Sequence, residues 1–168
     1  SRAARTLGYH PHPMPMAINS ITYEGRPACV NCGFCAFGCP VDAKGSSAVS
    51  AVRGGLLSGN LALMADCCAL SVDTEPSGTH ASGVVYLDPR GERRTVTARH
   101  VVLALNAIET PRLLLASSSS RHPDGLGNRS GQLGRNLMFH FFTLGIALFE
   151  EEVHAWRGPS STFTLDDF

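Results

Sequence analysis

Residues 101–117, VVLALNAIETPRLLLAS, contain a strand signal followed directly by a helix signal. The first five residues form a continuous apolar run, which is typical of a central strand buried on both faces of a parallel sheet. Thr110 and Pro111 then open a helix predicted to span residues 110–116, because proline is favoured in the first turn. The segment therefore predicts a buried strand that passes into a helix.

The segments upstream predict one more helix and several more strands. Apolar residues at spacings of three, four and seven indicate a helix from about residue 48 to 57, with Asp42 or Ser46 as its cap and Gly59 at its end. Strands are expected at residues 61–64, 67–72, 83–87 and 94–97, with a turn at 88–91. This order of elements indicates a mixed α/β or α+β fold.

The chain divides into three predicted regions. Residues 1–28 are rich in proline and are expected to be extended; their pair His10 and His12 supplies too few ligands for a metal site on its own. Residues 29–138 form the main predicted domain, which includes a polar loop at 117–128. Residues 139–168 open with an expected strand at 139–150 and would begin a second domain.

Composition excludes several classes of protein. With 43% hydrophobic and 17% charged residues, the 168-residue chain can build a core and is not a disordered tail. Lys+Arg and Asp+Glu are equal at 14 each, so the chain lacks the basic face typical of nucleic-acid binding. No apolar run is long enough to cross a bilayer, and no signal peptide is visible. The chain starts without Met and is expected to be an internal fragment.

Four cysteines lie within eleven residues, and Cys67 and Cys68 form a separate adjacent pair. The spacing C-x₂-C-x₂-C-x₃-C-P is that of bacterial ferredoxins, which indicates an iron–sulfur cluster held by Cys29, Cys32, Cys35 and Cys39. Zinc fits less well, because structural zinc sites pair two knuckles across a longer spacer. Two disulfides in one short loop would strain their geometry. A reduced loop of small, buried thiols remains the alternative to a cluster.

Four segments, in this order, resemble the glucose–methanol–choline oxidoreductases. They are residues 59–72, which begin GNLALMA; the hairpin from residue 83 with the strand run 98–104; NAIETPRLLLAS at 106–117; and GQLGRNLM at 131–138. The third looks like the family's second signature, defined by a proline and paired aliphatic residues. The resemblance covers about residues 25–140.

The resemblance implies a partial FAD-binding domain followed by the start of a substrate domain. Its expected contacts with FAD are the backbone at Ala69, near the adenine, and the turn and helix start at Asn106, Ala107, Thr110 and Pro111, near the ribityl or phosphate groups. The chain has no G-x-G-x-x-G to bind a pyrophosphate. The family's catalytic histidine lies in a C-terminal part outside this sequence, so no catalytic residue is assigned.

Departures from the commonest family pattern point to one branch. Asn106 replaces a small glycine or serine, as in the branch that contains gluconate and related sugar dehydrogenases. Ser118 replaces a glycine, and Phe139 stands where an aspartate usually precedes the residue matching His140. Some sugar dehydrogenases of this family hold an iron–sulfur cluster with a loop that Cys29, Cys35 and Cys39 resemble in spacing; Cys32 is extra.

Three functions compete at this point. The first is a flavin-dependent dehydrogenase that moves a hydride from a CH–OH carbon of an alcohol or sugar to FAD, with electrons leaving through a cluster or an acceptor protein. The second is a small ferredoxin-like iron–sulfur electron carrier, which explains residues 29–40 but not residues 106–117. The third, a zinc-stabilised interaction module, explains least. The sequence indicates neither a compartment nor an oligomeric state.

Overall fold

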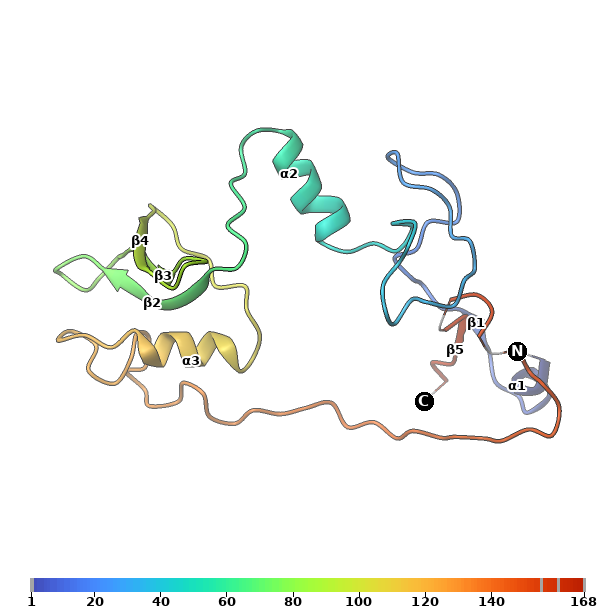
Figure 1. Cartoon of the computed structure of the whole chain (residues 1–168). Coiled ribbons are helices and arrows are strands. Elements are labelled where there is room, and N and C mark those ends of the chain that lie inside the picture. Colours follow the sequence, from blue (N-terminus) through green and yellow to red (C-terminus); the bar gives the residue numbers. More distant parts are fainter. Residues whose placement is uncertain (1, 155, 160, 168) are drawn as a thin grey trace. The chain divides into compact units, whose positions relative to one another are not determined.

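The computed structural model describes residues 2–154, 156–159 and 161–167. The chain forms two compact units (Figure 1). The sheet unit comprises Leu63–Leu144, and the terminal unit comprises Ser1–Ala62 together with Gly145–Phe168. Helices and antiparallel sheets occur together, which confirms the mixed α/β class. The three regions predicted from the sequence follow other boundaries and stay a prediction.

The sheet unit is built on an antiparallel meander. Strands β2 (Cys68–Thr74), β3 (Ala81–Leu87) and β4 (Arg93–Thr97) lie in the order β2-β3-β4. The turn between β3 and β4 is closed by Asp88, whose carboxylate accepts the N–H groups of Arg90 and Glu92, both at 2.9 Å. These bonds are the main reason that the pKa of Asp88 lies below its ordinary value. The predicted hairpin and turn are confirmed.

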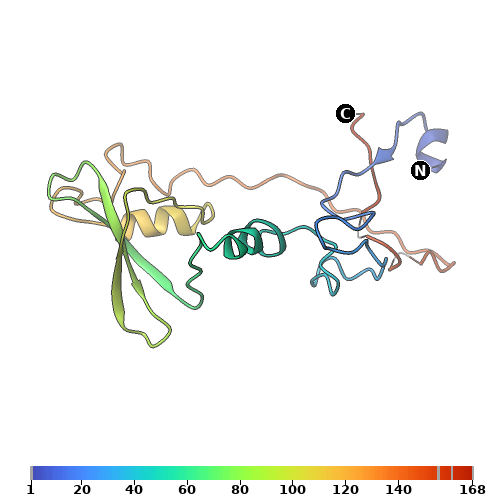
Figure 2. The ribbon, with the colours of Figure 1, turned by 90° about the horizontal axis from the view of Figure 1, so that it is seen from above.

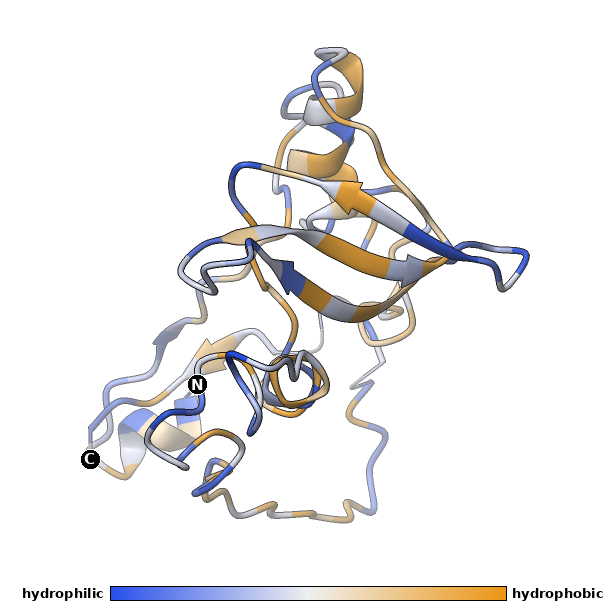
Figure 3. Cartoon of the chain, turned by 90° about the vertical axis from the view of Figure 1, so that its left-hand side faces the viewer, coloured by the Kyte–Doolittle hydropathy of each residue, from blue (hydrophilic) through white to orange (hydrophobic). Residues whose placement is uncertain are grey.

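Helix α3 (Glu109–Ala116) lies along β2 and supplies the core of this unit. Figure 2 shows the helix beside the strands, and Figure 3 shows hydrophobic and hydrophilic residues mixed along each strand. Leu113 is 1% exposed and packs in a core that includes Val72 and Val85. The apolar face of a short helix is thus buried against one face of the sheet, as two-layer packing requires. The predicted helix at 110–116 is confirmed.

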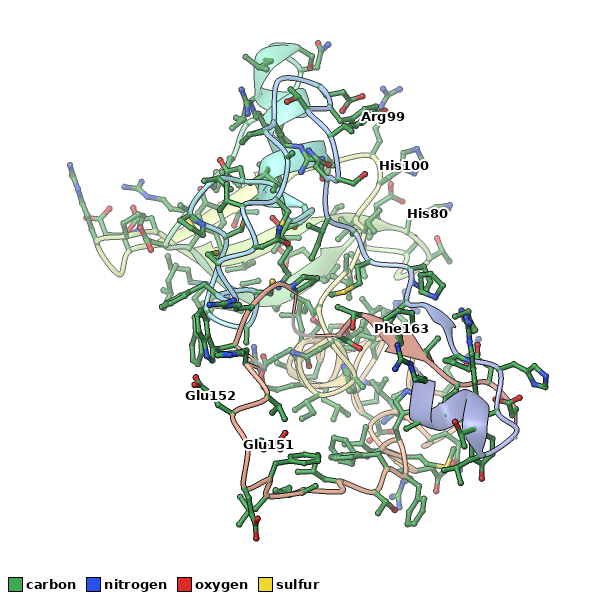
Figure 4. The ribbon with its side chains drawn as sticks, turned by 90° about the vertical axis from the view of Figure 1, so that its right-hand side faces the viewer. His80, Arg99, His100, Glu151, Glu152 and Phe163 are labelled. Atoms are coloured by element: carbon green, nitrogen blue, oxygen red, sulfur yellow. The ribbon has the colours of Figure 1, made fainter. Side chains whose placement is uncertain are left out.

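The terminal unit holds short elements. They are α1 (Arg2–Thr6), β1 (His12–Pro13), the π-helical turn η1 (Ala48–Val52), α2 (Arg53–Leu57) and β5 (Phe163–Thr164), whose Phe163 is labelled in Figure 4. Strand β1 pairs with β5 in antiparallel register. No helix among the described residues has the length and hydrophobicity that crossing a bilayer requires.

The helix predicted near residues 48–57 is confirmed as η1 and α2, but its predicted cap is wrong. Ser47 occupies the N-cap position and makes no side-chain capping bond. The carbonyl of Ser46, rather than its hydroxyl, accepts the N–H of Ser50 at 3.1 Å. The end is as predicted, because Gly59 adopts a φ of 72° and its N–H donates to the carbonyl of Leu56.

Three predicted strands are absent from the described residues: 61–64, 101–104 and 139–150. Their apolar side chains remain accessible, with Val102 84% and Phe141 97% exposed. An extended run becomes a strand only when a neighbour supplies hydrogen bonds, and no described segment pairs with these three. The region 1–28, expected to be extended throughout, also contains the short helix α1.

Candidate functional site

Asn106 begins helix α3 by acting as its cap. Its side-chain oxygen accepts the N–H groups of Ile108 at 2.9 Å and Glu109 at 2.8 Å, and its backbone carbonyl accepts the N–H of Thr110 at 3.0 Å. An asparagine in this place satisfies N–H groups that the helix itself cannot pair. The turn at Asn106 and Ala107, which is expected to contact FAD, is therefore shaped by a capping side chain.

An open groove of about 730 Å³ lies in the sheet unit along the first half of α3. Its second wall is the segment 132–138, so the groove joins two of the segments that resemble the flavin family. Three of the predicted cofactor residues, Ala107, Thr110 and Pro111, line it, and Asn106 adjoins it as the helix cap. The remaining lining residues are Ile108, Arg112, Leu115, Gln132, Leu133, Gly134, Arg135, Asn136, Leu137 and Met138.

The fifth predicted cofactor residue, Ala69, does not line this groove. It lies on β2, an edge strand of the sheet, opposite Tyr86 of β3. The register of the ladder shifts between Ala69 and Ser71, which marks a bulge at this point of the strand. Two separate places in the sheet unit therefore carry the residues predicted to contact FAD.

The groove combines apolar walls with two guanidinium groups. Arg112 pairs with Glu109, Nε to Oε2 at 2.6 Å, and this hydrogen bond raises the pKa of Arg112 above its ordinary value. Arg135 donates from Nε to the carbonyl of Gly131 at 2.7 Å. Guanidinium groups are permanently cationic and recognise phosphate and carboxylate. The groove thus suits a ligand that has both an apolar or aromatic part and an anionic part.

The loop after α3 is tied back onto the helix through Gly125. This residue has a φ of 99°, and a Cβ on it would lie 2.8 Å from the Cα of Leu115 and 3.0 Å from the carbonyl of Leu114. The N–H of Leu126 donates to that carbonyl at 2.8 Å. Gly125 is therefore required where this loop packs against the end of the helix.

Ser117 is a structurally important residue to which sequence reasoning assigned no role. It is 5% exposed, and its hydroxyl joins the end of α3 to strand β2. A serine at a predicted helix end is common, and only the tertiary structure shows what it contacts.

In the cysteine loop, residues 29–40, all four thiols are free. The sulfur of Cys39 accepts the N–H of Lys44 at 3.4 Å; this bond, followed by the N–H groups of Val41 and Ala43, lowers the pKa of the thiol. The sulfur of Cys29 accepts the N–H of Asn31 at 3.3 Å.

No three His, Cys, Asp or Glu residues in the described part of the chain lie together as metal ligands. The expected convergence of Cys29, Cys35 and Cys39 is not seen among the described residues. The assignment of these residues and Cys32 as metal ligands stays a prediction.

A close backbone approach constrains the same loop. Gly33 has a φ of 75°, and a Cβ on it would lie 2.0 Å from the carbonyl oxygen of Trp156. The N–H of Gly158 donates to the carbonyl of Asn31 at 3.1 Å. Glycine is therefore required at position 33 for two reasons: its positive φ, and the close approach of residues 156–158 to the loop.

Comparison with known proteins identifies the family. The sequence model of GMC oxidoreductase matches residues 2–142, which include the cysteine loop, the sheet and both walls of the groove. The chain belongs to the GMC oxidoreductase family. This confirms the resemblance found in the sequence and places the cysteine loop within an oxidoreductase domain.

Several relatives of this GMC oxidoreductase chain are named for an activity. It is 33% identical over 92% of its length to the fructose dehydrogenase large subunit of Gluconobacter japonicus, and 37% identical over 98% to paromamine 6'-oxidase of Streptomyces fradiae. It is 27% identical over 90% to the gluconate 2-dehydrogenase flavoprotein of Pantoea cypripedii. The aligned parts make up 28%, 32% and 25% of these relatives, so the chain spans about a quarter to a third of their length.

Proposed function

We propose that this GMC oxidoreductase chain is part of the FAD-binding domain of an enzyme that oxidises a CH–OH group of an alcohol or sugar. Membership of the family supports the oxidoreductase class. The names of relatives that act on fructose, gluconate and paromamine support a carbohydrate or related polyol as the donor. When bound, FAD would accept the hydride removed from that carbon.

The observation that carries the proposal is the groove between α3 and residues 132–138. Ala107 and Pro111 are small and leave room for a flat group against the start of the helix. Arg112 and Arg135 line the same groove and would hold an anionic group such as a phosphate, since guanidinium and phosphate match in charge and geometry. Backbone groups of β2 near Ala69 would contact the adenine edge.

This part of the chain would bind and orient the cofactor, and no residue in it is assigned a step in proton transfer. The electrons would pass to an acceptor protein in the complete enzyme. One relative is named a large subunit, which supports an assembly of that kind. No step in the proposed reaction is assigned to the cysteines.

Purification of the complete enzyme that contains this sequence tests the proposal. We expect flavin released by denaturation at about one per chain, together with dye reduction that depends on an added sugar or alcohol. Ala107→Leu, which narrows the groove, should lower flavin occupancy, whereas Ala98→Leu, away from the groove, should leave it unchanged. A wild-type enzyme that is folded and active but contains no flavin would refute the proposal.

A further inference from the structure

Ser117 is one of two buried polar residues among the described residues; the other is Arg26, in the terminal unit. Burial of a hydroxyl costs free energy unless it is hydrogen-bonded. The position directly after α3 is only 5% exposed, although Ser118, Ser119 and Ser120 beside it are all exposed. The contacts of Ser117 must therefore explain why it alone of this serine run is buried.

The hydroxyl of Ser117 makes two hydrogen bonds in different elements. It donates to the carbonyl of Leu113 at 2.6 Å, in the last turn of α3, and accepts the N–H of Val72 at 2.8 Å, on β2. Strand β2 lies at the edge of the sheet, so an N–H that does not pair with β3 needs another partner. The serine supplies that partner and closes the helix end at the same time.

This contact differs in kind from the rest of the packing between α3 and the sheet. The side chains of Leu113, Val72 and Val85 attract one another through apolar burial, which has no preferred direction. A hydrogen bond prefers a narrow range of distance and angle. Among the described residues it is the only hydrogen bond between β2 and the segment 106–117, so it selects one relative position of strand and helix.

Both predicted cofactor segments depend on this relative position. Ala69 lies three residues before Val72 on β2, and the groove residues Thr110 and Pro111 lie in the first turns of the helix that Ser117 ends. We propose that Ser117 is a positioning residue that holds the strand near the adenine in register with the groove, so that one FAD molecule can reach both. This inference rests on the proposed flavin-binding function.

The test compares Ser117→Ala with Val85→Ala. Val85 is 4% exposed on β3, so its truncation weakens the same core without removing the bond between strand and helix. Ser118→Ala, at the exposed neighbour, is the surface control. In the 168-residue chain, amide exchange at Val72 should accelerate in Ser117→Ala relative to wild type, a readout that needs no flavin.

In the complete enzyme, below the unfolding temperature of every variant, Ser117→Ala should raise the Kd for FAD about tenfold, the factor for losing a hydrogen bond worth 1.4 kcal/mol. The Kd of Val85→Ala and Ser118→Ala should stay within about twofold of wild type, because neither substitution alters the register.

If Ser117→Ala does not fold, Ser117→Cys takes its place with the same expectation, because cysteine keeps the size of the side chain but weakens both hydrogen bonds. Equal FAD affinity in the Ser117 variant and Val85→Ala, with flavin bound by wild type, would overturn this inference alone. Absence of flavin from wild type would overturn the proposed function too, while Val72 exchange would still report the bond.

Discussion

Replacement of Leu113 by alanine tests whether α3 is held to the sheet mainly by one side chain. Leu113 is 1% exposed, and the buried apolar side chains of the sheet unit among the described residues are Leu113, Val72 and Val85. Leu→Ala substitutions in cores cost about 2–5 kcal/mol, with lower values where neighbours can fill the cavity. Because this core is small and its rim open, we expect about 3 kcal/mol.

Urea denaturation followed by far-UV circular dichroism measures this loss. For a unit of this size the slope is about 1–3 kcal/mol per M, so the midpoint should fall by about 1–3 M. Val102→Ala is the matched control, because Val102 is 84% exposed and lies in no helix or strand. It should change the free energy of unfolding by less than about 0.5 kcal/mol. Equal midpoints for the two variants would show that α3 is not anchored through Leu113.

Three further predictions concern the terminal unit, the cysteine loop and activity. A hydrogen bond to Asp166 raises the pKa of His12 above 6.5, and hydrogen bonds to His10 lower the pKa of Asp167 below 3.8. The stabilisation from His12 is complete below pH 6.5 and is lost as the pH rises through the raised pKa of His12. The stabilisation from Asp167 is complete above pH 3.8 and is lost as the pH falls through the lowered pKa of Asp167. The pairing of β1 with β5 should therefore be strongest between pH 3.8 and 6.5, and the rate of amide exchange at Met14 measures it. In Asp166→Asn, this pairing should depend less on pH above 6.5.

If the four thiols of the cysteine loop are cluster ligands, the complete enzyme prepared without oxygen should contain iron and acid-labile sulfide. Active, flavin-loaded enzyme that contains no iron would contradict this prediction. The 168-residue chain alone should show no alcohol- or sugar-dependent dye reduction with added FAD, because it has no G-x-G-x-x-G; turnover by this chain would contradict the expectation.

The sequence by itself determined the local elements of this GMC oxidoreductase chain. The hairpin around residues 88–91 and the helix after Pro111 both follow from short-range chemistry: a turn-forming Asp-Pro-Arg-Gly and a proline in the first turn. The resemblance carried by residues 106–117 also singled out Ala107, Thr110 and Pro111, which line the groove. Their contact with FAD stays a prediction.

Only the tertiary structure decided the features that depend on distant partners. The apolar run at 101–104 predicts a strand, yet it forms none among the described residues, because strand formation depends on a neighbouring chain rather than on the run itself. The contacts of Gly33 and Ser117 cannot be predicted from the sequence. Gly33 meets the carbonyl of Trp156, 123 positions away, and Ser117 accepts the N–H of Val72, 45 positions away. Short-range patterns record propensity and burial, whereas a hydrogen bond between distant residues leaves no periodic signal in the sequence.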